Sequence, residues 1–136
     1  MYPAAGFHFQ VIFKGIDDPK GVDRGFLSVG GLKTGADASS DLPVLPVLIL
    51  KRGVKPYAAS ALTRWLFAHM HQHRVDPLDQ AQVDLLDESH KPYMSWILYN
   101  LRPKSWELSD LHGERSEPLI ETIGLSYERL EWAIAP

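Results

Sequence analysis

Three histidines lie close together in the segment His69-Met-His-Gln-His73. His69 and His73 are four residues apart, so on a helix they share one face and could bind one metal ion, while His71 points elsewhere. No glutamate lies between them at the position of the general base in zinc proteases. The same two histidines border the apolar stripe of the expected helix, where they could equally line the core or an interface. We therefore assign no metal ligand and no cofactor, and keep a small ligand- or metal-binding β-barrel as an alternative hypothesis.

Other arrangements that could carry catalysis are not apparent in the sequence. The chain has no cysteine, which excludes thiol nucleophiles, thiolate zinc sites and disulfides. No serine lies in a Gly-x-Ser-x-Gly frame, and the glycines of residues 28–32 lack the lysine and hydroxyl residue of a phosphate-binding loop. Paired carboxylates such as Asp17 and Asp18 lie in turn-like segments, where solvated charges are common. We therefore expect that the protein is not an enzyme.

Two cations and a glycine end the apolar segment Val47-Leu-Ile-Leu-Lys-Arg-Gly53. No nucleophile or phosphate loop is visible near Lys51 and Arg52, so a catalytic role for them has no support. These cations could instead meet acidic residues of an adjacent copy of the chain, which would fix strand register and protect a strand edge. A solvated strand end is an equally weighted alternative. Lys51, Arg52 and Gly53 are therefore candidates for a subunit interface.

The charge balance and the aromatic residues exclude some classes of partner. A net charge of −3 and an isoelectric point near 6.0 argue against a general nucleic-acid-binding protein. The tryptophans are not interleaved with basic residues, so we favour core and interface anchors over stacking platforms for bases or sugars. The N-terminal segment lacks the pattern of a signal peptide, and no apolar run approaches the length of a membrane span. We expect a soluble protein made in the cytoplasm, without membrane insertion.

The elements that would position these residues are mainly strands. Residues 7–14 alternate apolar and polar side chains with the two-residue period of a strand. Residues 57–73 contain no glycine or proline and place an apolar stripe from Leu62 to Met70 at helical spacing, which predicts the one helix. Further strands are expected over residues 26–32, 44–53, 80–87, 93–101, 104–111 and 118–132. This order predicts a mainly β single domain over residues 1–136, an antiparallel β-barrel or sandwich with one flanking α-helix.

The strand expected over residues 93–101 is apolar on both faces. Trp96 and Leu98 lie on one face, and Ile97 and Leu101 lie on the other. A small domain seldom buries both faces of a strand by itself, so we expect one face to contact a neighbouring subunit. Trp96 is a further candidate for that interface.

The order of these segments resembles the tail tube protein family of contractile phages and phage-tail-like injection systems. The resemblance runs from Gly6-Phe-His-Phe-Gln-Val-Ile-Phe13 through the Lys-Arg-Gly strand to the helix that carries Trp65. It continues through Asn100-Leu-Arg-Pro-Lys-Ser-Trp106 and Glu121-Thr-Ile-Gly-Leu-Ser-Tyr127. The resemblance therefore covers nearly the whole chain.

This resemblance implies a structural subunit that forms six-membered rings, which stack into a hollow tube. DNA or a protein cargo would pass through the lumen without specific binding, and the other partners would be neighbouring tube, sheath or baseplate proteins. The assembled phage tail or phage-tail-like particle would be extracellular after release. The positions that match the family pattern would serve folding and ring assembly rather than catalysis: Lys51, Arg52, Gly53, Pro103, Trp106 and Glu121.

One segment departs from the family pattern. Only residues 33–41 separate Leu32 from Leu42, where family members usually have a longer charged strand-turn-strand. The shortening raises the hypothesis of a specialised ring, such as an initiator that joins the tube to the baseplate or a terminator at the far end. A secreted ring protein of a related secretion system is a further alternative.

Overall fold

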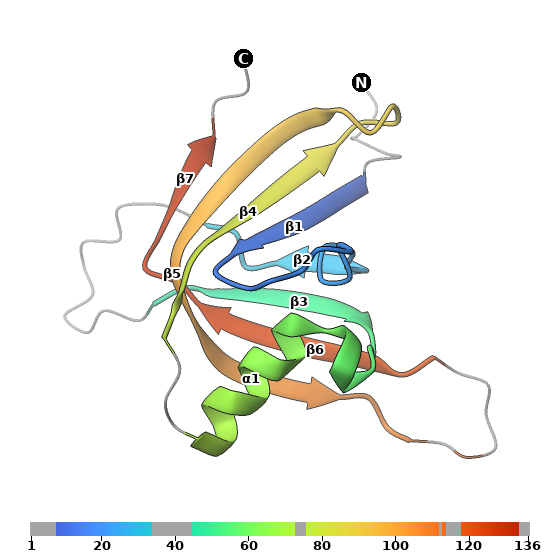
Figure 1. The fold of residues 1–136 in the computed structure, drawn as a ribbon. Helices are drawn as coiled ribbons and strands as arrows, with labels where there is room; N and C mark the ends of the chain where they lie inside the picture. The colour runs from blue at the N-terminus through green and yellow to red at the C-terminus, as the bar shows by residue number, and fades with distance from the viewer. Residues whose placement is uncertain (1–7, 34–44, 73–75, 112, 114–117, 134–136) are drawn as a thin grey trace.

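The computed structural model describes residues 8–33, 45–72, 76–111, 113 and 118–133, and seven strands and one α-helix make up the regular part of these residues (Figure 1). The elements follow in the order β1 (His8–Lys14), β2 (Ser28–Gly30), β3 (Val47–Gly53), the 3-10 turn η1 (Tyr57–Ala59), α1 (Ala61–Gln72), β4 (Leu78–Leu86), β5 (Pro92–Leu108), β6 (Ile120–Ser126) and β7 (Arg129–Ala133). The expected helix therefore begins later than predicted, because Tyr57–Ala59 form the separate turn.

All strand pairs are antiparallel, and the sheet has the order β1-β4-β5-β6-β3-β2, with β7 paired to β5. The long strand β5 joins two layers. Its first part pairs with β4 and β7, and together with β1 they form what we call the upper sheet. Its last part pairs with β6, and together with β3 and β2 they form the lower sheet. In Figure 1 the two sheets spread apart from β5, and α1 lies in front of the lower sheet.

The expected fold class is confirmed: the described chain is mainly antiparallel β-sheet with one helix, although its strands do not close into a barrel. β1 and β2 lie at opposite ends of the strand order. The segment between them partly fills the gap, because Val11 N donates to Arg24 O and Leu27 N donates to Lys51 O. This loop therefore supplies main-chain hydrogen bonds that a pair of strands would supply in a closed barrel.

β5 is one continuous strand, where the sequence predicts two. Leu98 and Leu101 were expected on opposite faces, yet both are fully buried in the core. The reason is Asn100, whose positive φ of 54° interrupts the two-residue alternation between them. The backbone turns at this point while the strand continues, so β5 passes from the upper to the lower sheet.

The stretch 118–132, expected as one strand, is divided into β6 and β7 by Tyr127 and Glu128. Tyr127 is fully buried, and its hydroxyl donates to Gly31 O at 2.7 Å and accepts from Lys33 N at 3.1 Å. Glu128 N donates to Tyr99 O, which keeps the chain alongside β5. Tyr127, between β6 and β7, therefore anchors residues 31–33 to the sheet.

One hydrophobic core fills the space between the two sheets and α1. It contains the inward residues of β1, β3, β4, β5 and β6, and Leu62 and Leu66 of the helix. Met70, at the end of the predicted apolar stripe, is exposed, because the last turn of α1 extends past the core. No helix in the described part of the chain is both long and apolar enough to cross a membrane.

Candidate assembly site

The side chain of Arg52 lies inside the protomer, with 1% of its surface exposed. Leu48, Leu50 and Arg52 alternate along β3 on the core-facing side, so the period of the strand turns Arg52 inward and Lys51 outward. Arg52 Nη1 forms an ion pair with Asp23 Oδ1 at 2.6 Å, and Nε pairs with Glu121 Oε2 at 3.0 Å. Two carboxylates from the same chain therefore compensate this buried guanidinium.

The same guanidinium also contacts the start of the helix. Arg52 Nη2 donates to Ser60 Oγ at 2.9 Å and to Thr63 Oγ1 at 3.1 Å. Ser60 caps the helix, because its hydroxyl accepts a hydrogen bond from Thr63 N at 3.0 Å. Phe26 lies under the guanidinium at 5.5 Å from its ring centre. The cluster therefore joins the β1–β2 loop, β3, β6 and α1.

Asp23 remains ionised in this cluster. Burial by itself would raise the pKa of this carboxyl, but hydrogen bonds from Arg52, Ser60 and the main-chain N–H of Leu62 hold the pKa below its usual value. The Leu62 N–H donates to Asp23 Oδ2 at 3.1 Å, at the positive end of the helix. A negative charge from a loop 39 residues upstream thus stabilises the N-terminus of α1.

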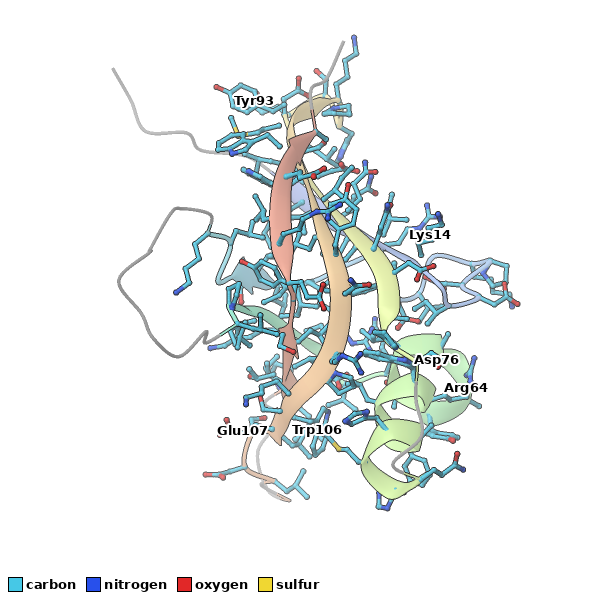
Figure 2. The ribbon with its side chains drawn as sticks, turned by 90° about the vertical axis from the view of Figure 1, so that its left-hand side faces the viewer. Lys14, Arg64, Asp76, Tyr93, Trp106 and Glu107 are labelled. Atoms are coloured by element: carbon cyan, nitrogen blue, oxygen red, sulfur yellow. The ribbon has the colours of Figure 1, made fainter. Side chains whose placement is uncertain are left out.

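Glu121 links the buried cluster to an exposed aromatic ring. Its side chain is buried, with Oε2 on Arg52 and Oε1 accepting a hydrogen bond from Trp106 Nε1 at 2.9 Å. The indole of Trp106 is nevertheless 43% exposed. Trp106 and Glu107 lie on opposite sides of the lower end of β5, with Trp106 on the side of α1 (Figure 2).

The strand edge beside Trp106 is open. Pairing between β4 and β5 ends at Leu101, and from Arg102 to Leu108 β5 pairs only with β6. At the other side of the lower sheet, β2 pairs only with β3. Both edges of the lower sheet therefore present main-chain groups without a strand partner among the described residues.

The structure brings together only some of the residues proposed for the subunit interface, which are Lys51, Arg52, Gly53, Trp96, Trp106 and Glu121. Arg52, Glu121 and Trp106 form one hydrogen-bonded chain of contacts. Lys51 is exposed on the other face of β3, and Gly53 ends that strand opposite Ile120. Trp96 lies in the upper sheet, half-buried, with its ring 5.8 Å from that of Trp132.

Arg52 differs from the sequence expectation in its partners. The sequence left an adjacent copy and solvent open as the surroundings of its charge, but Asp23 and Glu121 of the same chain are its partners. Asp23, Ser60 and Thr63 were not predicted as members of this cluster. Ser60 immediately before an apolar periodic stretch is a recognisable helix-start signal, whereas Asp23 is one of several acidic residues in a turn-rich loop and carries no local signal.

The hypothesis of a metal site at His69 and His73 can be compared with the structure only at His69. His73 lies outside the described residues. His69 lies in α1, and its Nδ1 atom is buried with no hydrogen-bond partner in the described structure. The His71 ring packs on Phe67 instead, at 4.3 Å between ring centres. Within the described ranges, no group of three or more potential ligand side chains could hold a metal ion.

Solved structures with the same fold belong to contractile injection systems. A chain in the structure of the tube-terminating cap of the anti-feeding prophage is 20% identical, with a TM-score of 0.74 over 99% of this chain and 93% of that chain. The sheath-tube complex of the extracellular contractile injection system PVC contains a chain at 18% identity and a TM-score of 0.73, covering 98% of this chain and 93% of that one. The baseplate of the anti-feeding prophage, 6-fold symmetrised, contains one at 24% identity and a TM-score of 0.66, covering 98% and 97%. The fold is therefore that of tail-tube-like proteins.

The sequence itself identifies the family. The family described as T4-like virus tail tube protein gp19 matches residues 45–131, which is more than half of the chain. The chain belongs to this tail tube family, and the resemblance noted in the sequence is confirmed. No curated protein matches the chain in sequence. The matched region contains Arg52, Trp106 and Glu121, whereas Asp23 lies outside it.

Proposed function

We propose that the chain is a structural subunit of the inner tube of a contractile phage tail or phage-tail-like injection system, and that it acts by closing into rings of six copies. The observation that carries this proposal is the family match over residues 45–131. The open edges of the lower sheet support it, because edges without partners favour association with further strands. The 6-fold symmetry of the baseplate that contains a similar chain supports the ring number.

The open edges also indicate the type of contact. The two edges of the lower sheet, at β2 and at the end of β5, are different surfaces. A contact between different surfaces of identical chains is head-to-tail, and it closes into a ring when the rotation between copies is suitable. Such rings would stack into a conduit, with DNA or protein cargo passing through the lumen without specific binding. This role needs no catalysis, and we propose that the protein is not an enzyme.

The partners and the location follow from the same role. We infer contacts with neighbouring tube, sheath or baseplate proteins, synthesis in the cytoplasm and presence in an extracellular particle after release. The match to a chain in the cap structure covers 99% of this chain and 93% of that one, which supports the proposal that residues 1–136 form one tail-tube-like domain. Lys51, Gly53 and Trp96 remain proposed interface residues, whereas Arg52 and Glu121 would act from inside the protomer.

A specialised position at one end of the tube is the second candidate, with the initiator ring at the baseplate as its main form. The short sequence between Leu32 and Leu42 favours it. Most of this segment, residues 34–41, lies outside the described structure. Chains with a similar fold occur in the structures of a tube-terminating cap and of a baseplate, so the fold is compatible with either end.

The test is negative-stain electron microscopy of the purified protein, combined with light scattering over a range of concentrations. Six-fold rings or stacked tubes are the expected result for a repeating subunit. Single rings that stack only after a baseplate or tube partner is added would identify an end ring. A chain that stays monomeric at all concentrations and joins no particle would contradict the proposal.

A further inference from the structure

Trp106 combines a large exposed ring with a fixed orientation. About two fifths of the residue is exposed, whereas the carboxylate that binds its indole N–H is 2% exposed. The hydrogen bond to Glu121 satisfies the one polar group of the indole, so the remaining exposed surface of the ring is apolar. Such aromatic side chains, with their polar group already bound, are typical of the residues that contribute most to protein interfaces.

The orientation of the ring depends on the buried cluster. Glu121 uses one carboxylate oxygen for Trp106 and the other for Arg52, at 2.9 Å and 3.0 Å. Arg52 is itself held by Asp23, Ser60 and Thr63. A side chain fixed before binding loses less conformational entropy when a partner covers it, which raises affinity. The cluster therefore prepares the ring for contact.

The position of Trp106 indicates a second copy of this chain as the partner. Pro103 and the register irregularity between Pro103 and Ser105 interrupt the first part of the open edge of β5. The regular part, from Ser105 to Leu108, is the part that carries Trp106. The same sheet has a second, different open edge at β2, so one copy offers the complementary strand edge to the next.

We propose that Trp106 is the anchor of the contact between copies, and that Glu121 and Arg52 are positioning residues that act through it. This inference rests on the proposed ring assembly. It assigns the apolar surface at the lower end of β5 to a neighbouring protomer rather than to sheath or cargo.

The experiment compares the assembly of full-length variants by sedimentation velocity with their monomer stability by thermal unfolding. In Trp106→Ala, the protomer concentration needed for half-assembly should rise about 30-fold or more, as for a typical interface hot spot. The melting temperature of the dissociated chain should also fall, because Glu121 loses one hydrogen bond, but the loss of assembly should be larger than this loss of stability accounts for. Phe67→Ala is the matched control, because Phe67 is 45% exposed on α1 and its ring contacts Tyr57 and His71. It should change assembly less than about threefold.

A double-mutant cycle tests the positioning role of Glu121. Glu121→Gln should weaken assembly in the wild-type background but add little in Trp106→Phe, which keeps an aromatic ring and lacks the N–H. A merely structural role of Glu121 would instead give the same effect in both backgrounds. If Trp106→Ala fails to fold, this cycle still tests whether Trp106 and Glu121 act together in assembly.

Three results would overturn the inference. Rings that form from Trp106→Ala at wild-type concentrations would show that the anchor lies elsewhere, while the proposed function would stand. Assembly losses that follow the loss of melting temperature in all variants would show that Trp106 serves folding only. If the wild-type chain forms no ring under any condition, the proposed function itself fails, and this inference fails with it.

Discussion

Arg52 and Glu121 are direct partners across β3 and β6, and their side chains form a buried ion pair with 3.0 Å between Nε and Oε2. The pair lies 69 residues apart in sequence. It connects the inner side of the lower sheet to the exposed Trp106 and, through Asp23, to the helix.

Replacing Arg52 by methionine should strongly destabilise the fold. The change removes the cation and leaves Asp23 and Glu121 buried without compensation, which should lower the free energy of unfolding by about 3–5 kcal/mol. Urea unfolding of the two proteins measures this difference. Lys51→Met, on the exposed face of the same strand, is the control and should change stability by less than about 0.5 kcal/mol. Equal effects of the two substitutions would contradict the buried-cluster assignment.

The stability of the protein should fall in acid because of Asp23. Its pKa in the folded state is below the usual value of 3.8, so the folded state favours the ionised form. The resulting stabilisation is complete above the usual pKa and is lost as the pH falls from there through the lower folded pKa. Chemical unfolding between pH 7 and pH 2.5 should show this loss. Asp23→Asn should be less stable at neutral pH and should show a shallower decline below pH 4. An unchanged slope in the variant would exclude Asp23 as a source of acid sensitivity.

Removing the Ser95 hydroxyl should weaken the contacts among β1, β4 and β5. Ser95 Oγ donates to Asp84 at 2.6 Å, and Asp84 also accepts hydrogen bonds from Gln10 and Gln82. Burial by itself would raise the pKa of Asp84, but these hydrogen bonds lower it. Ser95→Ala should therefore cost about 1–3 kcal/mol at pH 7, and the cost should shrink once Asp84 is protonated in acid. Ser126→Ala, in another strand, is the control. A cost that does not change with pH would argue against a role for the Asp84 charge.

Two neighbouring glycines should respond very differently to alanine. Gly31 has a φ of +81°, and a β-carbon there would overlap the main-chain oxygen of Val47. Gly31→Ala should therefore lower the free energy of unfolding by more than about 2 kcal/mol, because both the conformation and the space oppose it. At Gly30 a β-carbon would meet nothing within 4 Å, so Gly30→Ala should change stability by less than about 1 kcal/mol. Thermal unfolding of the two variants gives the comparison, and similar losses would refute the close approach at Gly31.

Much of the local structure could be predicted, because it depends on the period of apolar side chains. Residues 8–14 and 47–53 alternate as strands, and both form strands in the structure. The prediction that Leu98 and Leu101 lie on opposite faces of a strand was wrong. The positive φ of Asn100 places both side chains in the same core. A pattern of apolar residues carries no information about a single unusual backbone angle, so the continuity of β5 could not be seen.

Composition, local periodicity and the order of segments are sufficient to predict the strand-rich class, the helix after residue 57, the exclusion of cysteine chemistry and the family. Only the tertiary structure decided the partners of Arg52. Asp23 and Glu121 lie 29 and 69 residues away from it, and a charged residue at a strand end has the same local pattern whether it faces solvent, a neighbouring copy or its own chain. Strand register and the β1–β2 loop bury the guanidinium, so its partners come from its own chain. An arginine removed from water needs carboxylates within hydrogen-bonding distance.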